Sequence, residues 1–321
     1  MKMCDRTGSC MNISQTDMHI NEELPPEMLL ARNGKSFNWA KHFLGQEMGK
    51  DAAQLYSFCR LLDDMADGDI PHGSSRLAAV RDGLMKAQPT ADRALAGFYP
   101  FMQEKNIDCD VVLALIDGLL QDQNVVALET EDELLRYSYR VAGTVGLMMC
   151  KVLNCHNPAA LAHAIDLGIA MQLTNIARDV LEDATMRRRY VPASWVGNMT
   201  ADDILAASSS ADTAKIDIVA NGINRLLALA EIYYESGRLG LAYLPLRAHI
   251  SIAVALQVYR QIGVQLKNRG TPWQNGRQHT SKFSKFICTS LAMKSLVSRP
   301  MNRPVHDKHL HRALAGLPHV S

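Results

Sequence analysis

Two acidic clusters lie more than a hundred residues apart in the chain, and each has the spacing of one helix face. The first contains Asp63 and Asp67, and the second repeats the same four-residue step through Asn175, Asp179 and Asp183. Residues at that spacing are offset by only about 40° around a helix axis, so their oxygen atoms project together. Carboxylates that repel one another need a cation, and several hard oxygen ligands suit Mg²⁺, with Mn²⁺ as a substitute. The clusters therefore predict a divalent-metal site.

Each cluster has its own arginine. Arg60 comes one helical turn before the first aspartate of its cluster, and Arg178 directly precedes Asp179. A purely structural metal would gain little from these arginines, whereas a diphosphate anion needs them. A solvated charged face remains the alternative for one cluster alone, but two clusters with matching arginines argue against it. Asp64 and Glu182 fall off the shared face, and we expect them to be outside direct metal contact or exposed to solvent.

The segments that carry these residues have helical periodicity, with apolar residues at steps of three and four and no sustained strand alternation. The predicted helices lie near residues 46–66, 108–122, 131–153, 158–184, 212–239 and 243–268. Asn157-Pro158 has the form of an N-cap followed by proline at the first helical position. The breaks are too short for a domain linker, so we predict one all-α domain over residues 26–297. Residues 1–25 are expected to be a flexible leader, and 298–321 a basic tail that is not packed.

Small residues gather at Val141–Gly146 inside one predicted helix. Two glycines in a helix cost roughly 1 kcal/mol each relative to alanine, so a close-approach reason is expected. Tight helix–helix packing and a kinked wall that leaves room for a long apolar ligand are both compatible with this pattern. The chain also has 16 methionines, which fill irregular apolar cavities well, although ordinary core packing explains any single one.

The composition is that of a globular protein, with 47% apolar and 21% charged residues in a chain of 321. No apolar run is long enough for a transmembrane helix, and the N-terminal stretch lacks the apolar core of a signal peptide. The seven cysteines are scattered without a CxxC pair, a pattern typical of reduced thiols in the cytoplasm.

The net charge of +1 is unevenly distributed along the chain. From Lys267 to the end there are ten Lys and Arg residues and one acid, Asp307. Such a segment can bind phosphates or an anionic membrane surface, and a solvated helix followed by a disordered tail is the alternative. The segment has no known nucleic-acid-binding fold signature, so nucleic-acid binding is not expected.

Beyond the clusters, an ordered series of motifs runs through the chain. They are Gly34-Lys35-Ser36-Phe37, Tyr56-Ser57-Phe58-Cys59-Arg60, Asp63-Asp64-Met65-Ala66-Asp67, Tyr137-Ser138-Tyr139-Arg140, Val141-Ala142-Gly143-Thr144-Val145-Gly146, Gln172-Leu173-Thr174-Asn175-Ile176-Ala177-Arg178-Asp179, Tyr190-Val191-Pro192-Ala193-Ser194-Trp195, Leu244-Pro245-Leu246-Arg247 and Val258-Tyr259-Arg260-Gln261-Ile262-Gly263-Val264. This set, from Asn33 to beyond Arg277, resembles the bacterial phytoene synthases of the squalene/phytoene synthase family. One aspartate motif alone would be weak evidence for this family, but the ordered set of motifs is highly specific for it.

The resemblance implies an isoprenoid-synthase helical bundle with a central apolar cavity. It implies Mg²⁺-dependent head-to-head condensation of two geranylgeranyl diphosphates through prephytoene diphosphate to phytoene, the first committed step of carotenoid biosynthesis, without NADPH. The alternatives are a squalene or dehydrosqualene synthase that uses farnesyl diphosphate, and a non-catalytic prenyl-lipid binding or assembly subunit. The expected location is the cytoplasm, with peripheral attachment to the inner face of the membrane and contact with other carotenoid-pathway enzymes.

The resemblance also assigns roles by position. Asp63, Asp67, Asn175, Asp179 and Asp183 would be the metal ligands, and the four aspartates together with Arg60 would be the catalytic residues. The expected substrate contacts are Asn33, Lys35, Ser36, Phe37, Tyr56, Arg60, Tyr137, Val141, Val145, Gln172, Arg178, Tyr259 and Arg277. The chain departs from the family pattern at Asn33, at Arg187-Arg188-Arg189 and at Asn124. The change at Asn124 removes an arginine that could contact phosphate.

Overall fold

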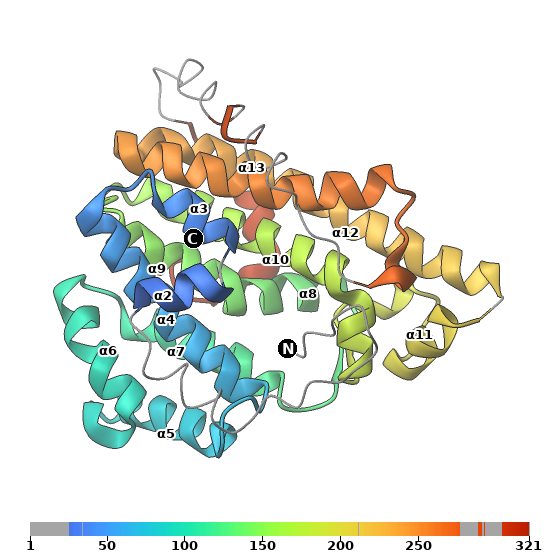
Figure 1. Cartoon of the computed structure of the whole chain (residues 1–321), viewed down its shortest axis with the longest axis horizontal. Coiled ribbons are helices and arrows are strands. Elements are labelled where there is room, and N and C mark those ends of the chain that lie inside the picture. The colour runs from blue at the N-terminus through green and yellow to red at the C-terminus, as the bar shows by residue number, and fades with distance from the viewer. Residues whose placement is uncertain are drawn as a thin grey trace.

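The computed structural model describes residues 26–33, 35–210, 212–276, 288–290, 292 and 304–320. These residues are predominantly helical, which confirms the all-α prediction (Figure 1). The helices are α2 (Pro26–Asn33), α3 (Lys35–Lys41), α4 (Gln46–Ala66), α5 (Gly73–Met85), α6 (Arg93–Glu104), α7 (Cys109–Gln121), α8 (Glu131–Ser138), α9 (Thr144–Val152), α10 (Ala159–Thr185), α11 (Ala201–Ser208), α12 (Thr213–Gly240) and α13 (Leu246–Asn268). Shorter helical turns are η1 (Pro89–Ala91), η2 (Tyr139–Gly143), η3 (Ala193–Trp195), η4 (Leu241–Tyr243), η5 (Trp273–Asn275) and η6 (Lys308–Leu314).

Helix α10 is the centre of the molecule. It packs against α12, α9, η2 and α13, and Figure 1 shows it in the middle with α13 along one edge and α5 and α6 at the opposite edge. Ile165, Ile169 and Leu173 of α10 have no exposed surface. Its 27 residues span about 40 Å, so it can carry a buried apolar stretch and a polar end in one rigid element.

The ends of α4 and α10 determine where the acidic clusters lie. Helix α4 ends at Ala66, with Asp67 as the C-cap and Gly68 behind it at φ 77°, a conformation that suits glycine. At the start of α10, Asn157 Oδ1 accepts a hydrogen bond from the Ala159 amide at 3.0 Å. The Asn157 side chain thus satisfies an amide at the helix start as predicted, but the helix begins one residue later, at Ala159, with Pro158 at the N-cap position. Both acidic clusters then fall in the last turns of their helices.

The predicted helix at 131–153 consists of three parts. Between α8 and α9 the backbone forms a single π-helical turn, η2. A Cβ on Gly146 would lie less than 3.0 Å from the carbonyl oxygen of Ala164, and one on Gly168 equally close to that of Ala142. Close packing of this segment on α10 therefore accounts for the small residues. The π turn in the same segment is also a local distortion, which the alternative explanation, a kinked wall beside a long apolar ligand, requires.

Some elements were not anticipated from the sequence. They are α2, α3, α5, α6, α11 and a two-residue parallel strand pair, β1 (Val126–Ala127) with β2 (Arg188–Arg189). Within the described residues, no helix combines the length and the low charge that crossing a membrane requires.

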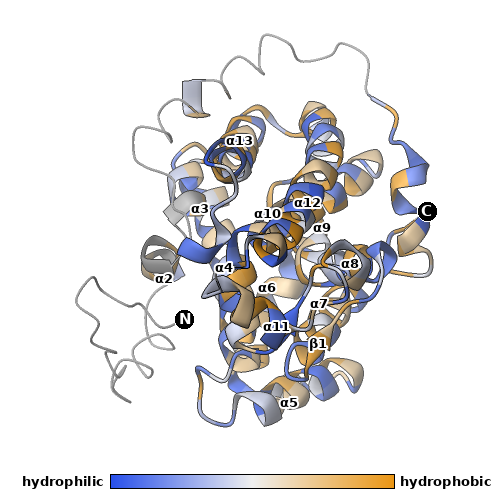
Figure 2. Cartoon of the chain, turned by 90° about the vertical axis from the view of Figure 1, so that its right-hand side faces the viewer, coloured by the Kyte–Doolittle hydropathy of each residue, from blue (hydrophilic) through white to orange (hydrophobic). Residues whose placement is uncertain are grey.

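The expectation of an unpacked tail over 298–321 is wrong for residues 304–320. Helix η6 packs on α8, and Figure 2 shows the C-terminus on that side of the molecule. Leu314 has no exposed surface, and the Tyr233 hydroxyl donates to the carbonyl of Leu310 at 2.9 Å. Charge and proline content predicted disorder here, but buried apolar and hydrogen-bonding side chains hold the segment in place. Residues 298–303 and 321 lie outside the described residues, as does the predicted leader 1–25.

Candidate active site

A cavity of about 810 Å³ runs between α4, α7, α9, α10 and α13. Oxygen-bearing and basic side chains line one part of it, and apolar side chains line the rest. The polar part consists of Arg60, Asp63, Asp67, Asp69, Asp122, Asn175, Arg178, Asp179, Glu182, Asp183, Arg188 and Tyr190. The structure thus brings the two acidic clusters into one space, although they are far apart in the sequence.

Arg188 links the two clusters. It follows α10, and its Nη1 donates to Asp67 Oδ1 on the other cluster at 2.8 Å. Its Nε donates to the carbonyl of Asp122, at the end of α7, at 3.1 Å. The pairing of Val126 with Arg188 in the β1–β2 ladder fixes the backbone at this point. This small sheet therefore positions a guanidinium between α4, α7 and α10.

The two arginines noted in the sequence are held by their own clusters. Arg178 makes two hydrogen bonds with the Asp179 carboxylate, at 2.7 and 2.5 Å. Arg60 donates to Asp63 Oδ2 at 2.8 Å and also pairs with Asp64. The guanidinium groups are thus fixed at the cavity wall before any anion arrives.

Electrostatics at the helix ends disfavours carboxylates. The C-terminal end of a helix carries a negative partial charge, and neither α4 nor α10 has a basic residue in its last turn. Burial raises the pKa of Asp63 to about 7, against the pull of Arg60 and with repulsion from Asp67. The Asp63 side chain keeps 44% of its surface accessible, but that surface faces the cavity. Burial and the neighbouring Asp179 likewise raise the pKa of Asp183.

A third acid, Asp122, stands between the clusters. Its two carboxylate oxygens accept hydrogen bonds from the hydroxyls of Tyr137 and Tyr190, both at 2.8 Å. The two rings stack with centroids 4.6 Å apart. Burial raises the pKa of Asp122 to about 6, in spite of these hydrogen bonds. Tyr137, predicted to contact substrate, thus orients a carboxyl group at the polar part of the cavity.

The residues present fit a divalent cation. Asn175 Oδ1 is buried and has no hydrogen-bond partner among the described residues, although it lies on the cavity wall next to the aspartates. An unpartnered amide oxygen and several carboxylates are hard donors of the kind that Mg²⁺ or Mn²⁺ binds. Positive charge at this point would also relieve the repulsion that raises the pKa of the aspartates.

The apolar part of the cavity contains the predicted lining residues. Phe37 lies against both Tyr56 and Tyr259, with ring centroids 6.1 and 5.3 Å apart. The other predicted lining residues in contact with the cavity are Val141, Val145 and Gln172. Leucines and methionines complete the wall: Leu115, Leu119, Met149, Leu153, Leu167 and Met171. A ligand with a charged head and a long hydrocarbon tail matches this division.

Not every predicted residue can be placed. The side chains of Asn33, Lys35 and Ser36, and all of Arg277, lie outside the described part of the structure. The roles assigned to the residues that line the cavity stay predictions.

Asp64 and Glu182 were predicted to lie off the face that the metal ligands share. Asp64 is 5% exposed and is held by Arg60, away from the cavity lining, whereas Glu182 lines the cavity. That neither acid contacts the metal directly stays a prediction.

Sequence reasoning missed Arg188, Asp122 and Tyr190 as site residues. The basic run at 187–189 was noted as a departure from the family pattern, but the β1–β2 pairing that brings Arg188 to Asp122 has no signal in the sequence. Asn124, which replaces an expected arginine, is exposed, and Arg188 supplies a guanidinium in the cavity.

Residues 30–284 match the family model of squalene/phytoene synthases, so the chain belongs to that family. It is 36% identical to the phytoene synthase of Pseudescherichia vulneris over 290 residues, which cover 85% of this chain and 92% of that protein. It is 33% identical to the 15-cis-phytoene synthase of Pantoea ananas, with 88% and 94% covered. The chain is therefore a prenyl-transferring enzyme.

Solved structures agree on the fold. A dehydrosqualene synthase in complex with a ligand superposes with a TM-score of 0.75 at 24% identity, covering 88% of this chain and 99% of that one. A squalene synthase from Alicyclobacillus acidocaldarius gives a TM-score of 0.65 at 20% identity, with 80% and 97% covered. The expected isoprenoid-synthase bundle is thus confirmed.

Proposed function

We propose that this chain is a phytoene synthase, which joins two geranylgeranyl diphosphates head to head. The observation that carries the proposal is the single cavity in which both acidic clusters and three arginines meet long apolar walls. The relatives named above, which are phytoene synthases, support the choice of substrate and product.

The reaction has two steps. First, the C1–O bond of one substrate breaks and its electron pair leaves with diphosphate. The double bond of the second substrate attacks that carbon, and loss of a proton closes the cyclopropane ring of prephytoene diphosphate. In the second step this diphosphate leaves, the carbon skeleton rearranges, and loss of a proton gives phytoene. These two reaction steps need no electron donor, in keeping with the expectation that NADPH is not used.

The chain's own residues have three tasks in these steps. Arg60, Arg178 and Arg188 hold the diphosphate groups and neutralise the departing charge. The aromatic and aliphatic walls, including Phe37 and Val145, orient the chains and keep water away from the carbocations. The tyrosine pair fixes the orientation of Asp122 at the polar end.

We propose Mg²⁺, or Mn²⁺, as the metal held by Asp63, Asp67, Asn175, Asp179 and Asp183. When bound, it would supply further positive charge to stabilise the leaving diphosphate.

The test is product analysis. The purified chain is incubated with geranylgeranyl or farnesyl diphosphate and Mg²⁺, with and without NADPH, and the products are identified by mass spectrometry. We expect a C40 hydrocarbon from geranylgeranyl diphosphate, unchanged by NADPH. A C30 product without any C40 product would overturn the choice of phytoene synthase. No product from either substrate would favour a non-catalytic prenyl-lipid binder.

We also propose peripheral attachment to the cytoplasmic face of an anionic membrane, where other carotenoid-pathway enzymes would take up the apolar product. The basic residues after Lys267 motivate this proposal. Sedimentation with anionic liposomes should fall as salt is raised, because salt screens the attraction. Absence of sedimentation at low salt would contradict it.

A further inference from the structure

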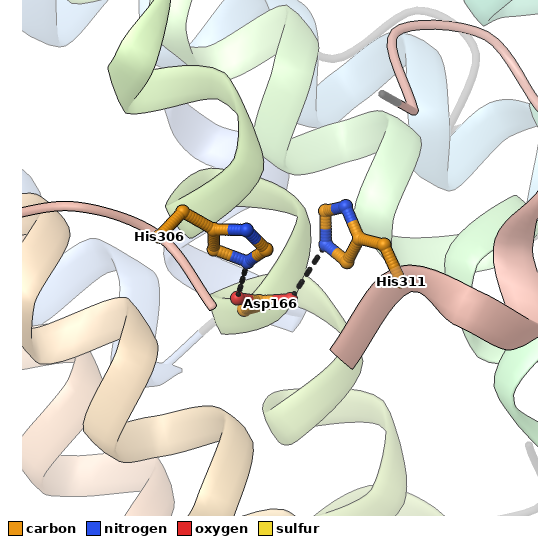
Figure 3. Close-up of side chains that lie close together, drawn as sticks. All are labelled: Asp166, His306 and His311. Carbon is orange, nitrogen blue, oxygen red and sulfur yellow. Dashed lines mark hydrogen bonds and ion pairs between the residues drawn. The ribbon is translucent and has the colours of Figure 1, made fainter. Parts of the chain in front are cut away.

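Three side chains meet at a point remote from the acidic clusters. Asp166 of α10 accepts hydrogen bonds from two imidazoles of the C-terminal segment: His306 Nε2 lies 2.7 Å from Oδ2, and His311 Nε2 lies 2.8 Å from Oδ1 (Figure 3). The ligand atoms of the three residues all lie within 4.8 Å of one another. Asp166 precedes Asn175 by nine residues, about 13 Å along the helix, so this cluster is separate from the diphosphate site.

The cluster is deeply buried. Asp166 has no exposed surface and His311 is 3% exposed. A buried carboxylate needs a compensating positive charge. In the described part of the chain, both ion pairs of Asp166 go to imidazoles rather than to lysine or arginine. An imidazole is cationic only when it is protonated, whereas the neutral ring is a metal ligand.

We propose that Asp166, His306 and His311 form a second metal site, specific for Zn²⁺ or a similar transition-metal ion. Two imidazole nitrogens with one carboxylate are a donor set that suits Zn²⁺ and disfavours Mg²⁺, which selects oxygen. The two rings face different oxygens of the same carboxylate, and their centroids are 4.4 Å apart. One ion can therefore be shared by all three residues, whereas one added proton makes only one of the two rings a cation.

Neighbouring polar groups support this assignment. The Ser236 hydroxyl donates to Asp166 Oδ2 at 2.5 Å and lies 3.0 Å from His163 Nδ1. Hydrogen bonds of this kind orient the carboxylates of metal sites. Because the single hydroxyl hydrogen goes to Asp166, His163 must donate from Nδ1, which leaves its Nε2 as a bare nitrogen. That Nε2 is buried without a partner among the described residues, and the His163 ring lies 5.2 Å from that of His306.

The ion joins the C-terminal segment to the central helix. The segment also has metal-independent contacts, since Arg136 donates to the carbonyls of Ala313 and Ala315 at 2.9 and 3.1 Å. His163, one turn before Asp166, lines the cavity. The site thus fastens the segment next to the cavity wall, while the segment can stay docked without the ion.

The test uses the full chain without a polyhistidine tag, stripped of metal by a chelator. CoCl₂ is titrated in while the visible spectrum is recorded, and ZnCl₂ is then added in competition. We expect one Co²⁺ per chain with the intense absorption of a four-coordinate ion, displaced by Zn²⁺. Asp166→Asn and His306→Gln should each abolish this absorption.

Two variants serve as controls. His309→Gln changes an exposed histidine of the same η6 turn and should leave the absorption intact. Asp179→Asn disables the acidic cluster and should also leave it intact. Absence of the absorption in the wild-type chain would overturn the proposal and leave a hydrogen-bonded contact only, even if the buried variants failed to fold. Loss in Asp179→Asn with retention in Asp166→Asn would overturn it as well. Because the readout is metal binding, it is independent of the product assay.

Discussion

Three guanidinium groups of the cavity wall are each paired with an aspartate. Arg60, Arg178 and Arg188 lie 2.5–2.8 Å from oxygens of Asp63, Asp179 and Asp67. Such pairs add little net stability, because desolvation offsets much of the attraction. Their role is to position charged groups. Each pair holds a guanidinium, which could bind a diphosphate, beside a carboxylate, which could bind a metal ion.

Loss of one metal-site aspartate tests the role of the clusters. Asp179→Ala or Asp63→Ala should lower turnover by roughly 100-fold or more, because a group that stabilises the leaving charge contributes on that scale. The helical circular dichroism should persist. Asp202→Ala, at an exposed position of α11, is the control and should have near-normal activity. Near-normal activity in the first two variants would show that the metal assignment is wrong.

The role of Arg188 in binding substrate can be tested by comparing its substitution with that of the adjacent Arg187. Arg188→Gln should lower kcat/KM by about tenfold to 100-fold, since a charged hydrogen bond is worth about 1.5–3 kcal/mol. Arg187→Gln changes an exposed side chain and should have little effect. Equal losses in the two variants would point to the general charge of the loop rather than to the contact with Asp67.

At the scale of elements, the central contact is that of η2 and α9 with α10. Glycines on both sides let the backbones approach, and Val141, Val145 and Gly146 of the same segment line the cavity. One packing arrangement therefore serves stability and shapes the site.

The surroundings of two glycines, one in this contact and one outside it, predict opposite effects of substitution by alanine. Gly168→Ala would force a Cβ against the Ala142 carbonyl and should destabilise the fold by about 1–3 kcal/mol. Gly97→Ala, in α6, meets nothing within 4 Å and should stabilise by about 0.4–1 kcal/mol. Urea denaturation measures both changes. Equal effects would mean that the contact with α10 is looser than described.

The elements also show what the sequence could predict. Long helices such as α4 and α13 lie within a few residues of their predicted bounds because their apolar periodicity is strong. The acids of α4 and α10 were recognised from their spacing. The β1–β2 ladder has only two residues per strand, too few for a periodic signal, and its partners are brought together by tertiary contacts. The packing of 304–320 was missed because charge and proline content say nothing about a buried partner such as Asp166.

On the scale of the whole molecule, the C-terminal parts of α4, α7 and α10 bring acids into one cavity. The pKa of Asp63 is raised from 3.8 to about 7 and that of Asp122 to about 6, mainly by burial. A carboxyl group whose pKa is raised by folding binds protons more strongly in the folded state than in the unfolded state. Stability from this source is therefore lost as the pH rises from about 4 to about 7.

Thermal melts can measure this pH dependence. In metal-free protein, Tm should fall between about pH 4 and about pH 7, and Mg²⁺ should raise it more at the upper end, where the carboxylates are ionised. Asp63→Asn should flatten the curve. A metal-free Tm that rises steadily over this interval would contradict the assignment.

For the metal and diphosphate proposed above, the arginine–aspartate pairs couple the two binding events. A metal ion alone must compete with a guanidinium for its carboxylate, and a diphosphate alone must compete with the carboxylate for its guanidinium. When both arrive, each displaced partner finds a new one. Metal and diphosphate should therefore strengthen each other's binding by the same factor, as thermodynamic reciprocity requires. Isothermal titration of each ligand with and without the other would measure that coupling, and the resting enzyme would hold neither tightly until its substrate is present.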